Sequence, residues 1–206
     1  MKGRNKMDEN AKKNERELRK YRAKLRMDYY PLPLRWFKFF RYVSMILNII
    51  NCISGIISYI LIAATINNPE AIEKIQVAFA EISGTSGMNM ELFTVIAVAD
   101  FLVTVYLLVL CVLVFKRMGT LAVSGYNLIV AFLISVPVIN GVRQLMSGCL
   151  NVMVYPEVYT FGDTVRNMIV MIAFSGVASL LNYIYFRKRK SLFTDCLLYT
   201  SPSPRD

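Results

Sequence analysis

The stretch LFTVIAVADFLVTVYLLVLCVLVF, Leu92–Phe115, decides the fold, because its 24 residues contain a single charged side chain, Asp100. An α-helix needs about 20 predominantly apolar residues to cross the hydrocarbon core of a bilayer. An apolar run of this length is too long for a buried helix in a soluble domain of this size. The stretch therefore predicts a membrane-spanning helix.

Three further stretches have the same character. Tyr42–Ala64, Met118–Val142 and Asn167–Phe186 contain no charged residue, and hydrophobic residues make up 55% of the whole chain. That composition is too apolar for an ordinary soluble domain. We predict an all-α fold, an integral membrane four-helix bundle over residues 35–190. The predicted spans lie at about 42–64, 92–115, 120–140 and 167–186, with outer loops at 65–91 and 141–166.

Lysine and arginine are distributed unevenly among the segments that join these spans. Fourteen of them precede the first span, whereas the loop before the second span has only Lys74 beside four glutamates. The last span ends in Arg187–Lys190. Basic residues concentrate on the cytoplasmic side of membrane proteins, so we predict that the N-terminus and the C-terminus are both cytoplasmic. About 40 residues, 19 of them charged, precede the first span, which predicts an uncleaved anchor in the cell membrane.

Residues 1–34 are predicted to form a basic cytoplasmic helix and linker. Asp8–Met27 is rich in Ala, Lys, Glu, Arg and Leu without Gly or Pro, and Tyr29–Pro33 then breaks the helix. Aromatic and basic side chains alternate over Arg35–Arg41, a pattern typical of the headgroup level. We expect residues 12–41 to bind anionic lipid headgroups; the alternative is a solvated helix that only holds the N-terminus inside. The basic helix Asp8–Met27 has neither a folded nucleic-acid-binding module nor base-stacking aromatic residues, so we expect no nucleic acid partner.

A helix is also predicted in the first outer loop. Asn68 can cap it, Pro69 suits its first position, and Glu70 suits its first turn. Apolar residues recur on one helix face, at Ile72, Ile75, Phe79 and Ile82. We expect this helix to lie on the outer membrane surface or to cover the bundle.

Small and polar residues recur on one side of every predicted span. The first has Ser44, Asn48, Asn51, Gly55 and Ser58; the second has Ala97, Asp100, Thr104 and Cys111; the third has Ser124, Asn127, Ala131 and Ser135; the fourth has Ser175, Ser179 and Asn182. Small residues let membrane helices approach each other, and polar ones bond across the interface. We therefore predict that these sides face inward.

Asp100 is the one charged residue in these spans. An acid near the middle of a membrane costs about 2.5–3.5 kcal/mol on insertion scales and often marks a functional site. Counting about 12 Å down each helix at 1.5 Å per residue groups Asp100 with Ser58, Ser135 and Ser175 in a candidate polar cluster. Arg143 and Arg166, at the outer ends of their spans, are candidate charge partners. A single acid without a second charge in any span favours a structural role, in which it fixes the helix register.

Histidine is absent from the sequence, which removes the commonest general base and the usual zinc and haem ligands. Cys52 and Cys111 lie inside spans and are predicted to be small core residues, whereas Cys149 lies near the outer face. No cysteine pair has metal-binding spacing. We predict that the protein is not an enzyme and that it has no cofactor, no metal site and no catalytic residue.

The last eleven residues, CLLYTSPSPRD (196–206), resemble the translation of a sequencing-library adapter. We therefore exclude them from the fold prediction and expect a cytoplasmic tail of residues 191–195 only.

The segments PLPLRWFKFFRYV (Pro31–Val43), LNIINCISGI (Leu47–Ile56) and NYIYFRKRKSLF (Asn182–Phe193) resemble a group of small four-span membrane proteins of Gram-positive gut bacteria. The resemblance covers mainly the two ends and the overall pattern of spans. It implies the same four-span topology. Because the group is uncharacterised, it implies no function and no site.

These features favour a non-enzymatic scaffold or accessory protein of the membrane. The alternative is a small transporter or channel subunit that uses Asp100, although a second carboxylate, broken helices and an inverted repeat are not evident. The partners that we expect are the lipid bilayer and either another membrane protein or a second copy of the chain.

Overall fold

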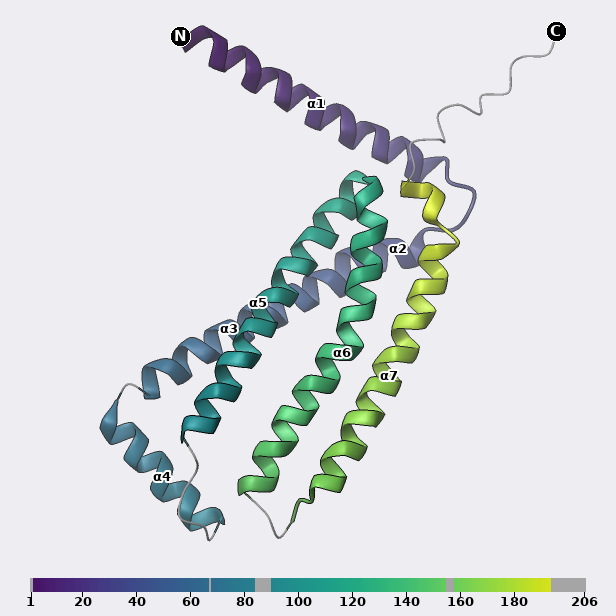
Figure 1. Cartoon of the computed structure of the whole chain (residues 1–206). Coiled ribbons are helices and arrows are strands. Elements are labelled where there is room, and N and C mark those ends of the chain that lie inside the picture. Colours follow the sequence, from purple (N-terminus) through teal and green to yellow (C-terminus); the bar gives the residue numbers. More distant parts are fainter. Residues whose placement is uncertain (1, 67, 84–89, 155–157, 194–206) are drawn as a thin grey trace, which may run out of the picture.

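The computed structural model describes residues 2–66, 68–83, 90–154 and 158–193, and within these ranges it contains helices and no strand. Four helices are long and apolar enough to cross a membrane (Figure 1), which confirms the predicted all-α four-helix membrane bundle. The elements are α1 (Lys2–Asp28), α2 (Arg35–Phe39), a π-helical turn η1 (Phe40–Ser44), α3 (Met45–Ile66), α4 (Pro69–Ser83), α5 (Met90–Thr120), α6 (Val123–Val154), α7 (Phe161–Arg187) and a 3-10 turn η2 (Lys190–Phe193).

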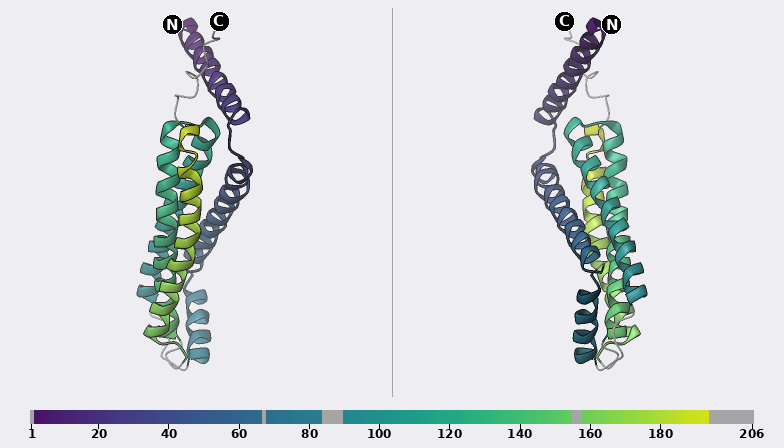
Figure 2. Two further views of the ribbon diagram at one scale, coloured as in Figure 1. Left: turned by 90° about the vertical axis from the view of Figure 1, so that its right-hand side faces the viewer. Right: turned by 90° about the vertical axis from the view of Figure 1, so that its left-hand side faces the viewer.

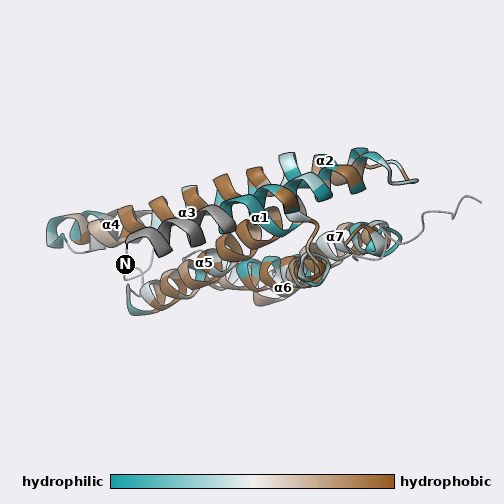
Figure 3. Ribbon diagram, turned by 90° about the horizontal axis from the view of Figure 1, so that it is seen from above, coloured by the Kyte–Doolittle hydropathy of each residue, from teal (hydrophilic) through white to brown (hydrophobic). Residues whose placement is uncertain are grey.

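The spanning helices form two layers. Helices α5, α6 and α7 lie side by side, and the continuous helix α2–η1–α3 runs across one face of them (Figures 1 and 2). Seen from above, α3 is separate from the three-helix layer and packs mainly on α5 (Figure 3). Most of the α3 surface is therefore left uncovered by the rest of the chain.

Helices α6 and α7 make the most extensive interface in the bundle. Two glycines of α6 allow this close approach. A Cβ atom added at Gly141 would lie 2.5 Å from Cγ1 of Ile172, and one added at Gly148 would lie 2.6 Å from Oγ1 of Thr164. These distances are too short for a side chain, so glycine at both positions brings the two backbones together.

The boundaries of the last two spans differ from their predicted limits. Helix α6 contains Pro137 and continues to Val154, so much of the segment 141–166, predicted as an outer loop, is helical. Helix α7 begins at Phe161, where Thr160 and Asp163 form a capping box. An apolar stretch marks where a helix crosses hydrocarbon, whereas capping residues and backbone hydrogen bonds decide where the helix ends.

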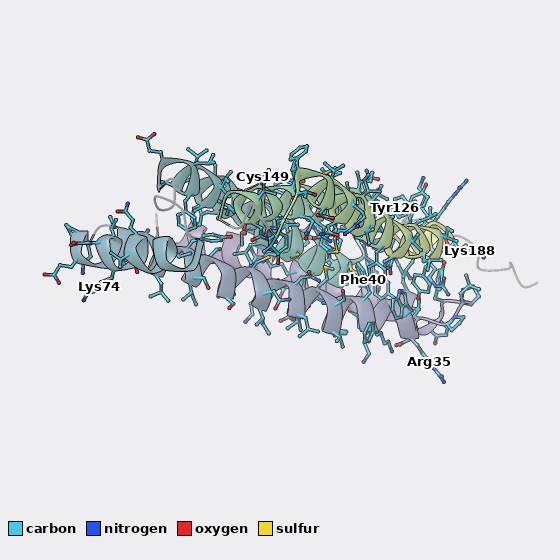
Figure 4. The ribbon with its side chains drawn as sticks, turned by 90° about the horizontal axis from the view of Figure 1, so that it is seen from below. Arg35, Phe40, Lys74, Tyr126, Cys149 and Lys188 are labelled. Carbon is cyan, nitrogen blue, oxygen red and sulfur yellow. The ribbon has the colours of Figure 1, made fainter. Side chains whose placement is uncertain are left out.

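The largest hydrophobic core lies at the end of the bundle where α1, α2 and η2 meet. Phe37, Phe40, Phe132, Phe186 and Phe193 are all buried there, and their rings contact one another edge-to-face or tilted. The aromatic side chains of Arg35–Arg41, which were predicted to lie at the headgroup level, are thus only partly at the surface. Trp36 and Phe39 are exposed, whereas Phe37 and Phe40 are buried. Figure 4 shows Phe40 between α3 and the rest of the bundle.

Arg189 connects the segment before α2 to the end of α7 at this core. Its guanidinium donates hydrogen bonds to the carbonyl oxygens of Pro33 (3.0 Å) and Tyr185 (3.2 Å) and lies 3.7 Å from the centre of the Tyr185 ring. The Tyr185 hydroxyl accepts a hydrogen bond from the backbone N–H of Phe37 at 3.0 Å. Hydrogen bonds therefore connect the segment before the first span to the end of the last span.

The two predicted helices outside the spans are present. Helix α1 runs across the end of the bundle, with Ala23 buried against it (Figure 1). Helix α4 starts at Pro69, and Asn68 Oδ1 accepts a hydrogen bond from the Glu70 N–H at 3.1 Å. The side chains of Ile75, Phe79 and Ile82, which were predicted to share a face with Ile72, lie outside the described residues.

The predicted inward faces are only partly correct. In α3, Asn48 and Gly55 are half-buried, but Asn51 and Ser58 are exposed, because α3 packs mainly on α5 and buries a narrow arc around Cys52. In α6 the prediction is wrong for Ser124, Asn127 and Ala131, which are exposed. The buried side of α6 instead carries Gly125, Ile129, Phe132, Leu133, Ile139, Gly141 and Gly148. Glycine and close-fitting apolar residues therefore define this interface, and polar residues do not.

Candidate functional site

The equal arms of the α5–α6 hairpin bring Asp100 and Arg143 to the same level. Helix α5 ends at Thr120 and α6 begins at Val123, so Asp100 lies 20 residues before the turn and Arg143 lies 20 residues after it. Leu121 forms the turn in a left-handed conformation with φ of 48°, which is rare for a residue with a branched side chain. The buried side chain of Leu121 holds this conformation in place.

Asp100 accepts hydrogen bonds from two other helices. Nε of Arg143 in α6 donates to Oδ1 of Asp100 at 2.7 Å, and this contact is also an ion pair. The hydroxyl of Tyr59 in α3 donates to Oδ2. Both carboxylate oxygens therefore have a partner, and the three helices α3, α5 and α6 meet at one carboxylate.

Thr104 extends the network by one turn of α5. Its hydroxyl donates to the backbone oxygen of Asp100 at 2.8 Å and accepts a hydrogen bond from Nη2 of Arg143. Thr104 is buried, and its Cγ2 would lie 3.4 Å from a Cβ atom added at Gly55. We call Tyr59, Asp100, Thr104 and Arg143 the Asp100 cluster.

The ion pair neutralises the charge that each residue would otherwise bring into the membrane. From Lys116, at the other end of the span, Asp100 lies 16 residues away, about 24 Å at 1.5 Å per residue. In a hydrocarbon core about 30 Å thick, Asp100 therefore lies in the third of the core that is farthest from Lys116. The side chains of Arg143 and Asp100 remain 34% and 22% exposed, so the protein does not seal the pair on every side.

The three serines predicted to surround Asp100 bond elsewhere. Ser58 donates to the Ser54 carbonyl at 3.1 Å, and Ser175 donates to the Met171 carbonyl at 2.5 Å. Both bonds follow the common preference of a helical serine for the carbonyl four residues earlier. Ser135 pairs with the hydroxyl of Tyr106 at 3.1 Å. The structure therefore does not join these serines to Asp100.

Of the two candidate charge partners, Arg143 contacts Asp100 and Arg166 does not. Arg166 pairs with Asp163 at 3.0 Å, one turn away on its own helix, and its side chain is 70% exposed. Counting residues from the α5–α6 turn distinguishes the two arginines, because only Arg143 is as far from the turn as Asp100.

Tyr59 was not among the predicted site residues, although its neighbour Ser58 was. The sequence could have indicated Tyr59, because a tyrosine hydroxyl lies farther from its own backbone than a serine hydroxyl does. The Tyr59 hydroxyl can therefore bond a residue of a neighbouring helix. The Tyr59 ring also packs edge-on against Phe101, with 6.1 Å between ring centres. This contact fixes the ring next to the carboxylate.

The Asp100 cluster combines a carboxylate, a guanidinium, a phenol and a threonine hydroxyl. Among the residues that the structure describes, no group of three or more His, Cys, Asp or Glu side chains comes together. No protein family, curated protein or solved structure matches this chain. The Asp100 cluster joins three helices and neutralises a charge within the membrane.

Proposed function

We propose that this chain is a non-enzymatic scaffold or accessory protein of a bacterial cytoplasmic membrane, with both ends in the cytoplasm. The observation that carries the proposal is the occupation of both Asp100 oxygens by Arg143 and Tyr59. A transported proton or cation would have to displace one of these donors. A carboxylate held in this way is suited to fixing the positions of three helices.

The proposed orientation rests on charge and on the arrangement of the ends. Arg35 and Lys188 lie at one end of the molecule, and Lys74 lies at the other (Figure 4). The end with Arg35 and Lys188 also carries α1, and it therefore collects most of the basic residues of the chain. This distribution supports a cytoplasmic location for that end.

Helix α1 supports the proposal that the basic segment 12–41 binds anionic lipid headgroups. Lys12, Arg16 and Arg19 recur at helical spacing on the same face as Ala23, which is buried against the end of the bundle. Because α1 runs across that end, this face turns toward the membrane plane. A dye on Arg16→Cys should sense the headgroups more strongly in anionic than in neutral vesicles, whereas a dye on Glu17→Cys should respond less; equal responses would contradict this.

A transporter or channel subunit that uses Asp100 is the second candidate. The partial exposure of Arg143 and Asp100 favours it, because a sealed structural pair would have no contact with its surroundings. Intramembrane ion pairs also occur along the pathways of transporters.

Flux measurements distinguish the two candidates. The full chain is reconstituted in liposomes with a pH-sensitive dye inside, and proton and potassium gradients are applied with an ionophore as the positive control. A scaffold should give the flux of empty liposomes, both for the native chain and for Asp100→Asn. Flux that the native chain supports and Asp100→Asn abolishes would reject the scaffold and establish transport.

A further inference from the structure

Asn51 in α3 is a polar residue without a partner in the middle of a membrane span. It lies 16 residues after Arg35 and 15 before Ile66, in the continuous helix α2–η1–α3. Its side chain is exposed, and within the described part of the chain nothing bonds to its amide. Hydrocarbon offers no hydrogen bonds, so an unpaired amide at this depth is costly.

Two other asparagines in the spans, Asn48 and Asn182, show how such an amide can be satisfied within the chain. Nδ2 of Asn48 donates to the Ser44 carbonyl at 2.8 Å. Asn182 accepts a hydrogen bond from Nε1 of Trp36 at 2.9 Å and donates to the Ala178 carbonyl at 2.8 Å. Asn51 differs from both, which points to a partner outside this single chain.

The residues around Asn51 form a continuous seam on the exposed side of α3. The seam consists of Leu47, Asn51, Ser54, Ser58 and Leu61, at spacings of four, three, four and three residues. This is the spacing of a left-handed pair of helices. All five side chains are exposed, with Leu47 at 54% and Leu61 at 63%. Since α3 lies in its own layer, a second helix can reach the seam (Figure 3).

From the chemistry of this seam we infer that two copies of the chain form a dimer through α3. An asparagine amide has both donors and an acceptor, so two Asn51 side chains facing each other across a two-fold axis satisfy each other. Ser54 and Ser58 are small, and they let the two backbones approach. The seam carries no charge, and thus it offers nothing that would select a charged partner instead.

The dimer is independent of the function proposed for the Asp100 cluster. Tyr59 points toward Asp100, whereas the seam lies on the side of α3 away from Cys52, which is buried toward α5. A failed flux experiment therefore does not affect the dimer, and a monomeric chain does not affect the assignment of Asp100.

Energy transfer between labelled copies of the full chain in lipid vesicles measures the association. Diluting the vesicles with lipid gives the dissociation constant. Asn51→Leu keeps the size of the side chain but removes the amide, and we expect about tenfold weaker association. Asn51→Gln, which keeps an amide, should weaken the association less. A native chain that is monomeric in the vesicles would overturn the proposal. An Asn51→Leu variant that associates as strongly as the native chain would overturn it as well.

Cysteine cross-linking tests which face of α3 is used. In a variant without the four native cysteines, Ser54→Cys and Leu61→Cys should form cross-linked dimers under a membrane-permeable oxidant. Ile53→Cys and Ile60→Cys are matched controls, because these residues are 45% and 60% exposed but lie about a third of a turn away. The proposed interface would be overturned if the control positions cross-link as efficiently as the seam positions, or if neither set cross-links.

Discussion

A double-mutant cycle on Asp100 and Arg143 tests whether the ion pair holds the helices together. The variants are Asp100→Asn, Arg143→Gln and the double substitution, which keep the approximate sizes of the side chains. Arg143 donates to Asp100 at 2.7 Å, and its second nitrogen bonds Thr104, so each single variant leaves a charged residue without its partner. The double variant removes both charges.

The magnitudes follow from burial and from the chemistry of each group. Breaking a fully buried pair costs about 3–5 kcal/mol, and an exposed pair contributes at most about 1 kcal/mol. With side chains 34% and 22% exposed, the Asp100 pair lies between these limits. We expect a cost of about 3 kcal/mol for Asp100→Asn, which leaves the guanidinium of Arg143 without a counter-charge. We expect about 2 kcal/mol for Arg143→Gln, because the carboxylate of Asp100 keeps the hydrogen bond from Tyr59. The double variant should cost about 3 kcal/mol, which leaves a coupling of about 2 kcal/mol.

Unfolding of the full chain in mixed micelles with increasing SDS provides the free energies. Trp36 is the single tryptophan of the chain, and it stacks on Phe39 and bonds Asn182, so its fluorescence changes when the helices separate. If the cost of the double variant equals the sum of the two single costs to within about 0.5 kcal/mol, the ion pair does not hold the helices together. The pair would then be two independent polar residues that happen to lie close together.

Two further predictions concern the packing and the orientation of the bundle. Gly148→Ala should destabilise the protein by about 1–3 kcal/mol in the same SDS unfolding measurement, because its Cβ would collide with Thr164. Gly176→Ala is the control, since nothing lies within 4 Å of the added Cβ; an equal loss for both would contradict the close α6–α7 contact. In cells that express a variant without the four native cysteines, a membrane-impermeant thiol reagent should label Lys74→Cys from outside and Lys188→Cys only after permeabilisation. The opposite pattern would reverse the proposed topology.

The spans could be predicted from the sequence because hydrocarbon imposes a length and a composition that are readable residue by residue. The inward faces of α3 and α6 could not, because small and polar residues occur both where helices touch and where they do not. Asn127 and Ala131 show this for α6, since both are residue types found at interfaces and both are exposed. Which side packs depends on the shapes of neighbouring helices, and Gly141 and Gly148 decide it for α6.

The candidate site was predictable in part for a similar reason. Asp100 stands out because a charge in hydrocarbon is costly wherever the helix lies. Its partner Arg143 follows from the equal arms of the α5–α6 hairpin, which is a local property of the chain. Tyr59 comes from α3, whose position against α5 depends on long-range packing, and no count along the chain gives the angle at which it crosses.

The two ends of the bundle are held together by different means, and this sets where the protein can change shape. Near the chain termini, interlocked aromatic rings and the Arg189 contacts join the first and last spans. Beyond Cys52, Leu107 and Ile139, which form a small second core, the contact of α3 with α5 depends on the Asp100 cluster, in which Tyr59 bonds Asp100. Weakening the cluster should therefore loosen the part of α3 around Tyr59 while Phe37 and Phe186 stay packed. Hydrogen exchange of Asp100→Asn should then accelerate in the α3 residues around Tyr59, and equal acceleration at Phe186 would show that the bundle opens as one unit.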